Sequence, residues 1–183
     1  PDNTAFRYEN ESLTFEELVK RSNGLAFMLN ELGVKRGDRV GIFLDASLET
    51  PISVYGIMSA GAVFVPLDPN APAARIAYVI NDCGTRHIIS GKKQSRSLKK
   101  VLEENTSIEF VIGIDEELPV KTISWEEIAR ISPSETVYVR ILEDDLAYIM
   151  YTSGTTGTPK GIMHSHRSGL AYAKLSMDLY NVR

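Results

Sequence analysis

The chain has 183 residues, of which 43% are hydrophobic and 24% charged, and its formal net charge is -4. These values are typical of a globular protein and exclude the disordered and fibrous classes. An acidic chain is poorly suited to neutralising many phosphates, so nucleic acid is not an expected partner. No apolar run approaches the roughly 20 residues of a membrane span, and no leader pattern is visible, so we expect a cytoplasmic protein without a membrane partner.

Both ends of the sequence suggest a piece of a longer protein. Pro1 is not a methionine, and residues 181–183 follow a helical pattern directly. The single cysteine, Cys83, has no partner for an intramolecular disulfide, which favours a reducing compartment. Because nothing beside Cys83 would activate a thiolate, we interpret it as a buried bystander thiol.

The first elements predicted are a β-hairpin and a helix. The stretch AFRYENESLTF alternates apolar and polar residues around the turn at residues 10–12. Thr14 and Glu17 then have the spacing of a capping box, in which each side chain accepts a hydrogen bond from a backbone N–H at the helix start. Leucines at helical spacing follow, and Gly33 supplies a stop, so the pattern predicts a helix of about 18 residues.

The next hundred residues alternate between strand and helix patterns. Short apolar runs are each followed by an amphipathic stretch, and Ser124 with Glu127 forms a second capping box at the start of a short helix. This rhythm predicts an α/β fold with a mostly parallel sheet and helices on both of its faces. The strands are expected at residues 39–44, 62–67, 86–90 and 109–114, and the helices at 48–60, 72–82 and 95–104.

Two further stretches carry no strong signal. Residues 131–143 are polar and are interpreted as a connector, and the basic residues between 92 and 100 are interpreted as a solvated helix face. Asp144 and Asp145 could suggest paired carboxylates for acid–base chemistry, but a solvated turn before the next strand is the better interpretation. Trp125, inside the short helix, is interpreted as a core anchor.

The segment with chemical character follows a predicted buried strand, LAYIMY, at residues 146–151. It is TSGTTGTPKG, residues 152–161, which concentrates hydroxyls, glycines and one lysine in ten positions. Glycines let backbone N–H groups approach an anion, hydroxyls add rotatable donors, and a lysine adds a compact positive charge. The composition therefore predicts a loop that binds a polyphosphate.

Three other interpretations of this loop are less consistent with the sequence. A flexible Ser/Thr/Gly linker would seldom follow a buried strand and precede another apolar-alternating stretch. A Walker A loop needs Gly before its Lys and Ser or Thr after it, whereas Pro159 and Gly161 flank Lys160 here. The glycine spacing of the dinucleotide fingerprint is also absent.

YTSGTTGTPKG resembles the signature phosphate loop of the adenylate-forming superfamily, which includes amino-acid adenylation domains of non-ribosomal peptide synthetases, acyl-CoA synthetases and luciferases. LTFEEL at residues 13–18 and MSAGAVFVPLDPNAPAARIAYVINDCG at residues 58–84 resemble the first two core motifs of the adenylation domains. The resemblance covers nearly the whole chain. It implies that residues 1–183 form the N-terminal part of the AMP-binding large domain, without the remainder of that domain or the small C-terminal lid domain.

The resemblance implies a two-step ligase in which a carboxylate attacks ATP, pyrophosphate leaves, and a thiol of coenzyme A or phosphopantetheine captures the acyl group. The acid is expected to be an amino acid or a related acid, with a carrier protein as partner, because Arg75 and Asp82 in PAARIAYVIND resemble adenylation domains. A Mg²⁺ ligand is expected beyond residue 183. The residues carried over for ATP phosphates are Thr152, Ser153, Gly154, Thr155, Thr156, Gly157 and Lys160, the last also as the catalytic residue.

Two alternatives stay open. An acyl-CoA synthetase acting on a fatty or aryl acid would carry the same loop. A non-catalytic nucleotide-binding module would keep the fold without the chemistry. His164 and His166 would share one face of a strand, as two metal ligands do, but no third ligand is visible and we assign no metal here.

Overall fold

A computed structural model describes residues 1–131, 139–153 and 158–180 of the chain. It begins with a two-stranded antiparallel hairpin of β1 (Thr4–Tyr8) and β2 (Glu11–Thr14), followed by helix α1 (Phe15–Glu31). The predicted capping box is present, with Glu17 N–H donating to Thr14 Oγ1 at 3.2 Å and Thr14 N–H donating to Glu17 Oε2 at 2.8 Å. The hairpin and this helix start are therefore confirmed.

Seven strands form one sheet within the described residues, in the order β7-β6-β5-β3-β4-β8-β9. Neighbouring strands are parallel except for β8 and β9, which form an antiparallel pair at one edge. The predicted α/β fold with a mostly parallel sheet is thus confirmed. The strands are β3 (Arg39–Phe43), β4 (Val63–Pro66), β5 (His87–Ser90), β6 (Phe110–Ile112), β7 (Lys121–Ile123), β8 (Leu146–Thr152) and β9 (Lys160–Ser165).

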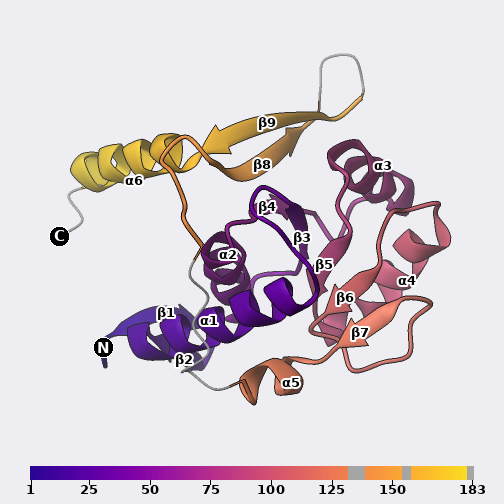
Figure 1. The fold of residues 1–183 in the computed structure, drawn as a ribbon, viewed down its shortest axis with the longest axis horizontal. Helices are drawn as coiled ribbons and strands as arrows, with labels where there is room; N and C mark the ends of the chain where they lie inside the picture. The colour runs from indigo at the N-terminus through magenta and orange to yellow at the C-terminus, as the bar shows by residue number, and fades with distance from the viewer. Residues whose placement is uncertain (132–138, 154–157, 181–183) are drawn as a thin grey trace.

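Helices connect these strands close to their predicted positions, and Figure 1 shows them around the sheet. The second capping box is also present, because Glu127 N–H donates to Ser124 Oγ at 3.1 Å and Ser124 N–H to Glu127 Oε2 at 2.7 Å. The helices are α2 (Glu49–Ser59), α3 (Ala73–Cys83), a 3-10 turn (Lys92–Gln94), α4 (Ser95–Glu103), α5 (Trp125–Ala129) and α6 (His166–Tyr180).

The two faces of the sheet carry separate cores, as alternation along a strand requires. On β3, Val40 and Ile42 face the cluster that contains α1, α2 and α5, whereas Phe43 belongs to the cluster with α3 and α4. Helices therefore cover both faces, as predicted. Helix α2 connects β3 to β4 across one face of the sheet, and α3 connects β4 to β5 across the other face. Strand β5 therefore pairs with β3 on the side away from β4.

The edge formed by β8, β9 and α6 differs from the sequence prediction. The run at residues 146–151 was expected to be a buried strand, but only alternate residues are covered: Ile149 is 7% exposed and Met150 44% exposed. The prediction of full burial is wrong, because helix α3 packs on one face of β8 only. Figure 1 shows the β8–β9 hairpin and α6 along one side of the molecule, and α6 has no buried residue among those described.

Strand β7 was not predicted. It has three residues, and its first, Lys121, is exposed, so it carries no apolar pattern. Its partners come from β6, through pairs such as Val111 with Thr122. Among the residues that the structure describes, no helix has both the length and the apolarity needed to cross a membrane.

Candidate functional site

The predicted phosphate loop is held at both of its ends by one antiparallel ladder. Thr152 is the last residue of β8, Lys160 is the first of β9, and the two are direct partners in the register. Both side chains are exposed, as is that of Ser153. Gly154, Thr155, Thr156 and Gly157 lie outside the described residues. The structure thus brings Thr152, Ser153 and Lys160 to the mouth of one loop.

The loop leaves the sheet beside the end of β4. Strands β4 and β8 are parallel neighbours, so their carboxyl ends lie at the same sheet edge. A cavity of about 440 Å³ lies at this position, between the segment that follows β4, helix α3 and the end of β8. Its lining residues are Pro66, Leu67, Asp68, Ala71, Pro72, Arg75, Ile76, Val79 and Tyr151.

Local hydrogen bonds order the wall of this cavity. Asp68 Oδ1 accepts from the backbone N–H of Asn70 at 2.9 Å, and Asp68 C=O accepts from Ala71 N–H at 3.0 Å, which closes the turn before α3. Pro72 precedes the first helical residue, where its missing N–H removes no helix hydrogen bond. Arg75, in the first turn of α3, adds a cationic side chain to the lining.

Tyr151 lines this cavity and directly precedes Thr152, the first residue of the phosphate loop. Its hydroxyl donates to Asp82 Oδ2 at 2.5 Å, although the two residues are 69 positions apart in the sequence. Burial raises the pKa of the Tyr151 hydroxyl far above its ordinary value, and the bond to Asp82 adds to this effect. The tyrosine therefore stays protonated and remains a donor at neutral pH. Sequence reasoning named Asp82 only as a mark of resemblance and did not single out Tyr151.

Other residues singled out in the sequence have structural roles here. Asp145 closes a turn by accepting from Leu142 N–H at 2.8 Å, and it pairs with Arg36, which lowers the pKa of the Asp145 carboxyl. Asp144 is exposed, so the turn interpretation holds. Cys83 is buried, and its thiol donates to the Val79 carbonyl.

The two histidines do not share a strand. His164 lies on β9, where its ring stacks on Tyr148 at 4.5 Å, whereas His166 begins α6. Over the described ranges, no group of three or more His, Cys, Asp or Glu residues is placed to hold a metal ion. The two histidines therefore do not share one face of a strand, because β9 ends at Ser165.

A second cavity, of about 320 Å³, follows the carboxyl ends of β3, β5 and β6. Four of its lining residues are acidic and two are lysines, Lys92 and Lys93. Because this balance disfavours a highly charged anion, the cavity is a poorer place for a polyphosphate than the loop beside Lys160. The acidic residues are Glu9, Glu11, Asp45 and Glu49.

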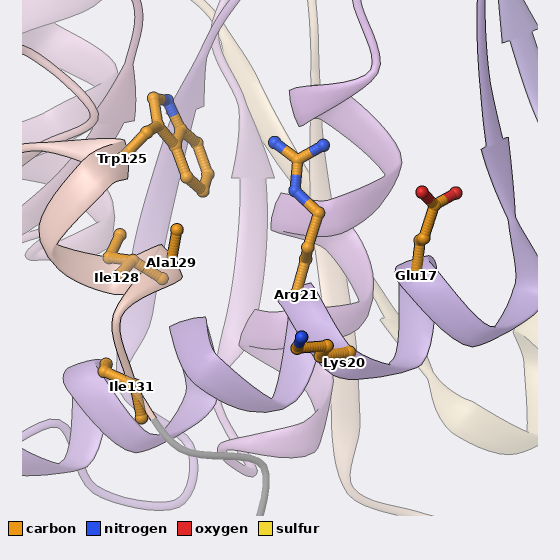
Figure 2. Close-up of a pocket in the computed structure, with 7 residues that line it drawn as sticks. All are labelled: Glu17, Lys20, Arg21, Trp125, Ile128, Ala129 and Ile131. Carbon is orange, nitrogen blue, oxygen red and sulfur yellow. The ribbon is translucent and has the colours of Figure 1, made fainter.

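A third cavity, of about 290 Å³, lies between α1 and α5. Figure 2 shows Trp125 and Ile128 on one side and the α1 residues Glu17, Lys20 and Arg21 on the other. Glu17 is already used by the capping box, and Arg21 lies 3.7 Å from Glu49. The indole of Trp125 packs so closely against Gly113 that a Cβ atom there would collide with Nε1, and it contacts the core as predicted.

Comparison with known proteins shows which family the chain belongs to. The sequence model of a family described as AMP-binding enzyme matches residues 1–182. This chain belongs to that family. The loop between Thr152 and Lys160 lies within the residues that this family model matches.

Curated relatives in this AMP-binding family are long synthases. Gramicidin S synthase 2 of Brevibacillus brevis is 37% identical over 95% of this chain and 4% of the relative. Indigoidine synthase of Streptomyces lavendulae is 35% identical over 92% of this chain and 12% of the relative. Zwittermicin A synthase ZmaJ of Bacillus cereus is 34% identical over 100% of this chain, which spans 32% of its length. The chain thus corresponds to a small part of each of these relatives.

Solved structures agree on the fold. The anthranilate CoA ligase AuaEII, in complex with anthranoyl-AMP, superposes with a TM-score of 0.80 and 27% identity over 91% of this chain and 32% of that one. The non-ribosomal peptide synthetase FmoA3 superposes with a TM-score of 0.78 at 24% identity, over 100% of this chain and 17% of that one. The described fold is thus that of the N-terminal portion of adenylate-forming enzymes.

Proposed function

We propose that the protein carrying this chain is an ATP-dependent ligase that converts a carboxylic acid into an acyl-adenylate, releases pyrophosphate and then transfers the acyl group to a thiol. The observation that carries the proposal is the loop between Thr152 and Lys160, which opens beside a cavity at the carboxyl edge of the sheet in a member of the AMP-binding enzyme family. The remaining parts of the site are proposed to lie in segments after residue 183.

In this proposal the loop binds the β- and γ-phosphates of ATP. Thr152, Ser153, Thr155 and Thr156 supply hydroxyl donors, Gly154 and Gly157 let the backbone approach the phosphates, and Lys160 supplies positive charge. When the carboxylate attacks the α-phosphorus, the bond to the departing pyrophosphate breaks and charge accumulates on that group. Donors already oriented toward it stabilise this charge without reorganisation, which is the proposed catalytic role of Lys160.

The ligand groups for Mg²⁺ are not proposed within this chain. The described residues offer no cluster of three metal-ligating side chains, and no step assigned to this chain passes through the metal ion. We propose that a carboxylate after residue 183 holds it.

For the acid, we favour an amino acid or a related acid, with a carrier-bound phosphopantetheine thiol as acceptor. Relatives named as gramicidin, bacitracin and tyrocidine synthases, at 32–37% identity, support this choice. The second candidate is an acyl-CoA synthetase acting on an aryl or fatty acid, which the similarity to an anthranilate CoA ligase favours. A non-catalytic nucleotide-binding module is the third.

The test is acid-dependent exchange of pyrophosphate into ATP, catalysed by the full-length protein with panels of amino, aryl and fatty acids. Exchange with one amino acid supports the first candidate, and exchange only with aryl or fatty acids supports the second. If no acid of any class supports exchange while ATP still binds, the ligase proposal is wrong and the binding module is favoured.

A further inference from the structure

Few backbone hydrogen bonds hold the carboxyl end of β8 to β4, its neighbour on the inner side of the sheet. Its register with β4 consists of one pair, Phe64 with Tyr148, and β4 ends at Pro66, which has no N–H to donate. The other neighbour, β9, belongs to the same hairpin as the loop. The position of the loop relative to the sheet therefore depends on side chains of β8 beyond Tyr148.

Two side chains of β8 beyond Tyr148 face helix α3. Ile149 is 7% exposed and packs in the same core cluster as Val79 and Ile80. Two residues further along, Tyr151 shares this face, and its hydroxyl reaches Asp82 at 2.5 Å. Ile76, Val79 and Ile80 bury one side of α3, so Asp82 is carried by a firmly packed helix.

The ring of Tyr151 also contacts the returning strand. A Cβ atom at Gly161 would lie 3.0 Å from Tyr151 Cζ and 3.0 Å from Ile149 Cγ2, so the absence of a side chain leaves room for the ring beside β9. Gly161 is the direct partner of Tyr151 in the ladder and is covalently next to Lys160. One tyrosine thus contacts α3 on one side and the residue beside Lys160 on the other.

We infer that Asp82, Tyr151 and Gly161 form a brace that sets the position of Thr152 and Lys160 at the mouth of the phosphate loop. Tyr151 and Asp82 are positioning residues in this inference, because they act through Thr152 and Lys160. The inference rests on the proposed function, since it gives the brace a role only if the loop binds ATP phosphates.

The brace is better suited to positioning than to stabilising the fold. Tyr151 is only partly buried and its bond to Asp82 is open to solvent, and solvent-exposed polar pairs contribute little to the free energy of unfolding. A displacement of a catalytic group by about 1 Å, in contrast, can lower a rate by about 100-fold. Removing the hydroxyl should therefore affect the reaction with ATP more than it affects stability.

The experiment compares Tyr151→Phe with wild type in the full-length protein, using ATP–pyrophosphate exchange with its preferred acid and thiol transfer from supplied acyl-adenylate. We expect kcat/KM for ATP to fall about tenfold, an intermediate displacement effect, with transfer from acyl-adenylate changed less than about twofold. Asp82→Ala should give the same pattern, and Asp82→Asn, which keeps an acceptor oxygen, should recover most of the loss. The matched control is Tyr148→Phe, a tyrosine of the same strand that lies outside the proposed brace.

Four outcomes overturn the inference, and a fifth overturns the proposed function. The brace is refuted, but the proposed function is not, if Tyr151→Phe exchanges pyrophosphate within about twofold of the wild-type rate while Lys160→Ala is strongly impaired. Equal losses in both half-reactions, or the same loss in Tyr148→Phe, indicate a general structural role. Additive effects of Tyr151→Phe and Asp82→Ala in the double variant show that they do not act through their bond. If Lys160→Ala leaves exchange unchanged, the proposed function itself fails.

Discussion

Helices α1 and α2 pack so closely that one added methyl group should destabilise the protein. At Gly56 of α2, a Cβ atom would lie 2.7 Å from Leu25 Cδ2, 2.9 Å from its Cγ and 3.0 Å from its Cβ. Leu25 is fully buried in the core between these helices, so it has little room to move away. Overpacking of this kind costs about 1–3 kcal/mol. Alanine is more favourable than glycine in a helix by roughly 1 kcal/mol, so Gly56→Ala should lower the free energy of unfolding by up to about 2 kcal/mol.

The matched control is Gly169→Ala in α6, where the added Cβ would meet only Tyr148 Cε1 at 3.5 Å, an ordinary contact. That variant should keep the helix-propensity gain and be about 0.5–1 kcal/mol more stable than wild type. Thermal unfolding of the 183-residue chain measures both, with an expected change of about 2–4 °C per kcal/mol. The double variant with Leu25→Ala should lose less than the sum of the single losses, because the clash is gone. Equal shifts for both glycines would refute the packing argument.

The remaining predictions concern pH and acid choice. Burial lowers the pKa of His87 from its ordinary 6.5. The unfolded chain therefore binds this proton more readily, so the free energy of unfolding should fall as the pH drops below about 6.5, and His87→Phe should flatten urea-unfolding midpoints between pH 7 and 5. If the variant keeps the wild-type slope, another group causes it. In a chimera, residues 1–183 joined to the remainder of a related ligase should keep the acid preference of that remainder, because the motifs here build the sheet or the loop. An active chimera that takes the preference of the donor of residues 1–183 would contradict this division.

Much of the fold could be predicted because its signals are local. The capping boxes at Thr14 and Ser124 depend on side chains three residues apart, and the helix and strand periods are visible within a single element. The phosphate loop was predictable for the same reason, since its glycines, hydroxyls and lysine fall within ten residues. Its assigned residues stay a proposal.

The rest depends on partners that are distant in the sequence. Strand β7 exists because Lys121 to Ile123 align with β6, and nothing in those three residues marks a strand. The half-exposure of β8 depends on which elements cover its two faces. The Arg36–Asp145 pair and the Tyr151–Asp82 bond join residues 109 and 69 positions apart, so no window of the sequence contains both partners.

The central claim is that the loop ending at Lys160 binds the phosphates that leave as pyrophosphate. The most direct measurement compares the two half-reactions of Lys160→Ala in the full-length protein, with Lys100→Ala, an exposed lysine of α4, as control. Loss of one charge-assisted contact should slow acid-dependent ATP–pyrophosphate exchange about 10- to 150-fold and leave Lys100→Ala at the wild-type rate. Thiol transfer from supplied acyl-adenylate should change little, because pyrophosphate has already left. Equal losses in both half-reactions, or an unchanged exchange rate, would contradict the account.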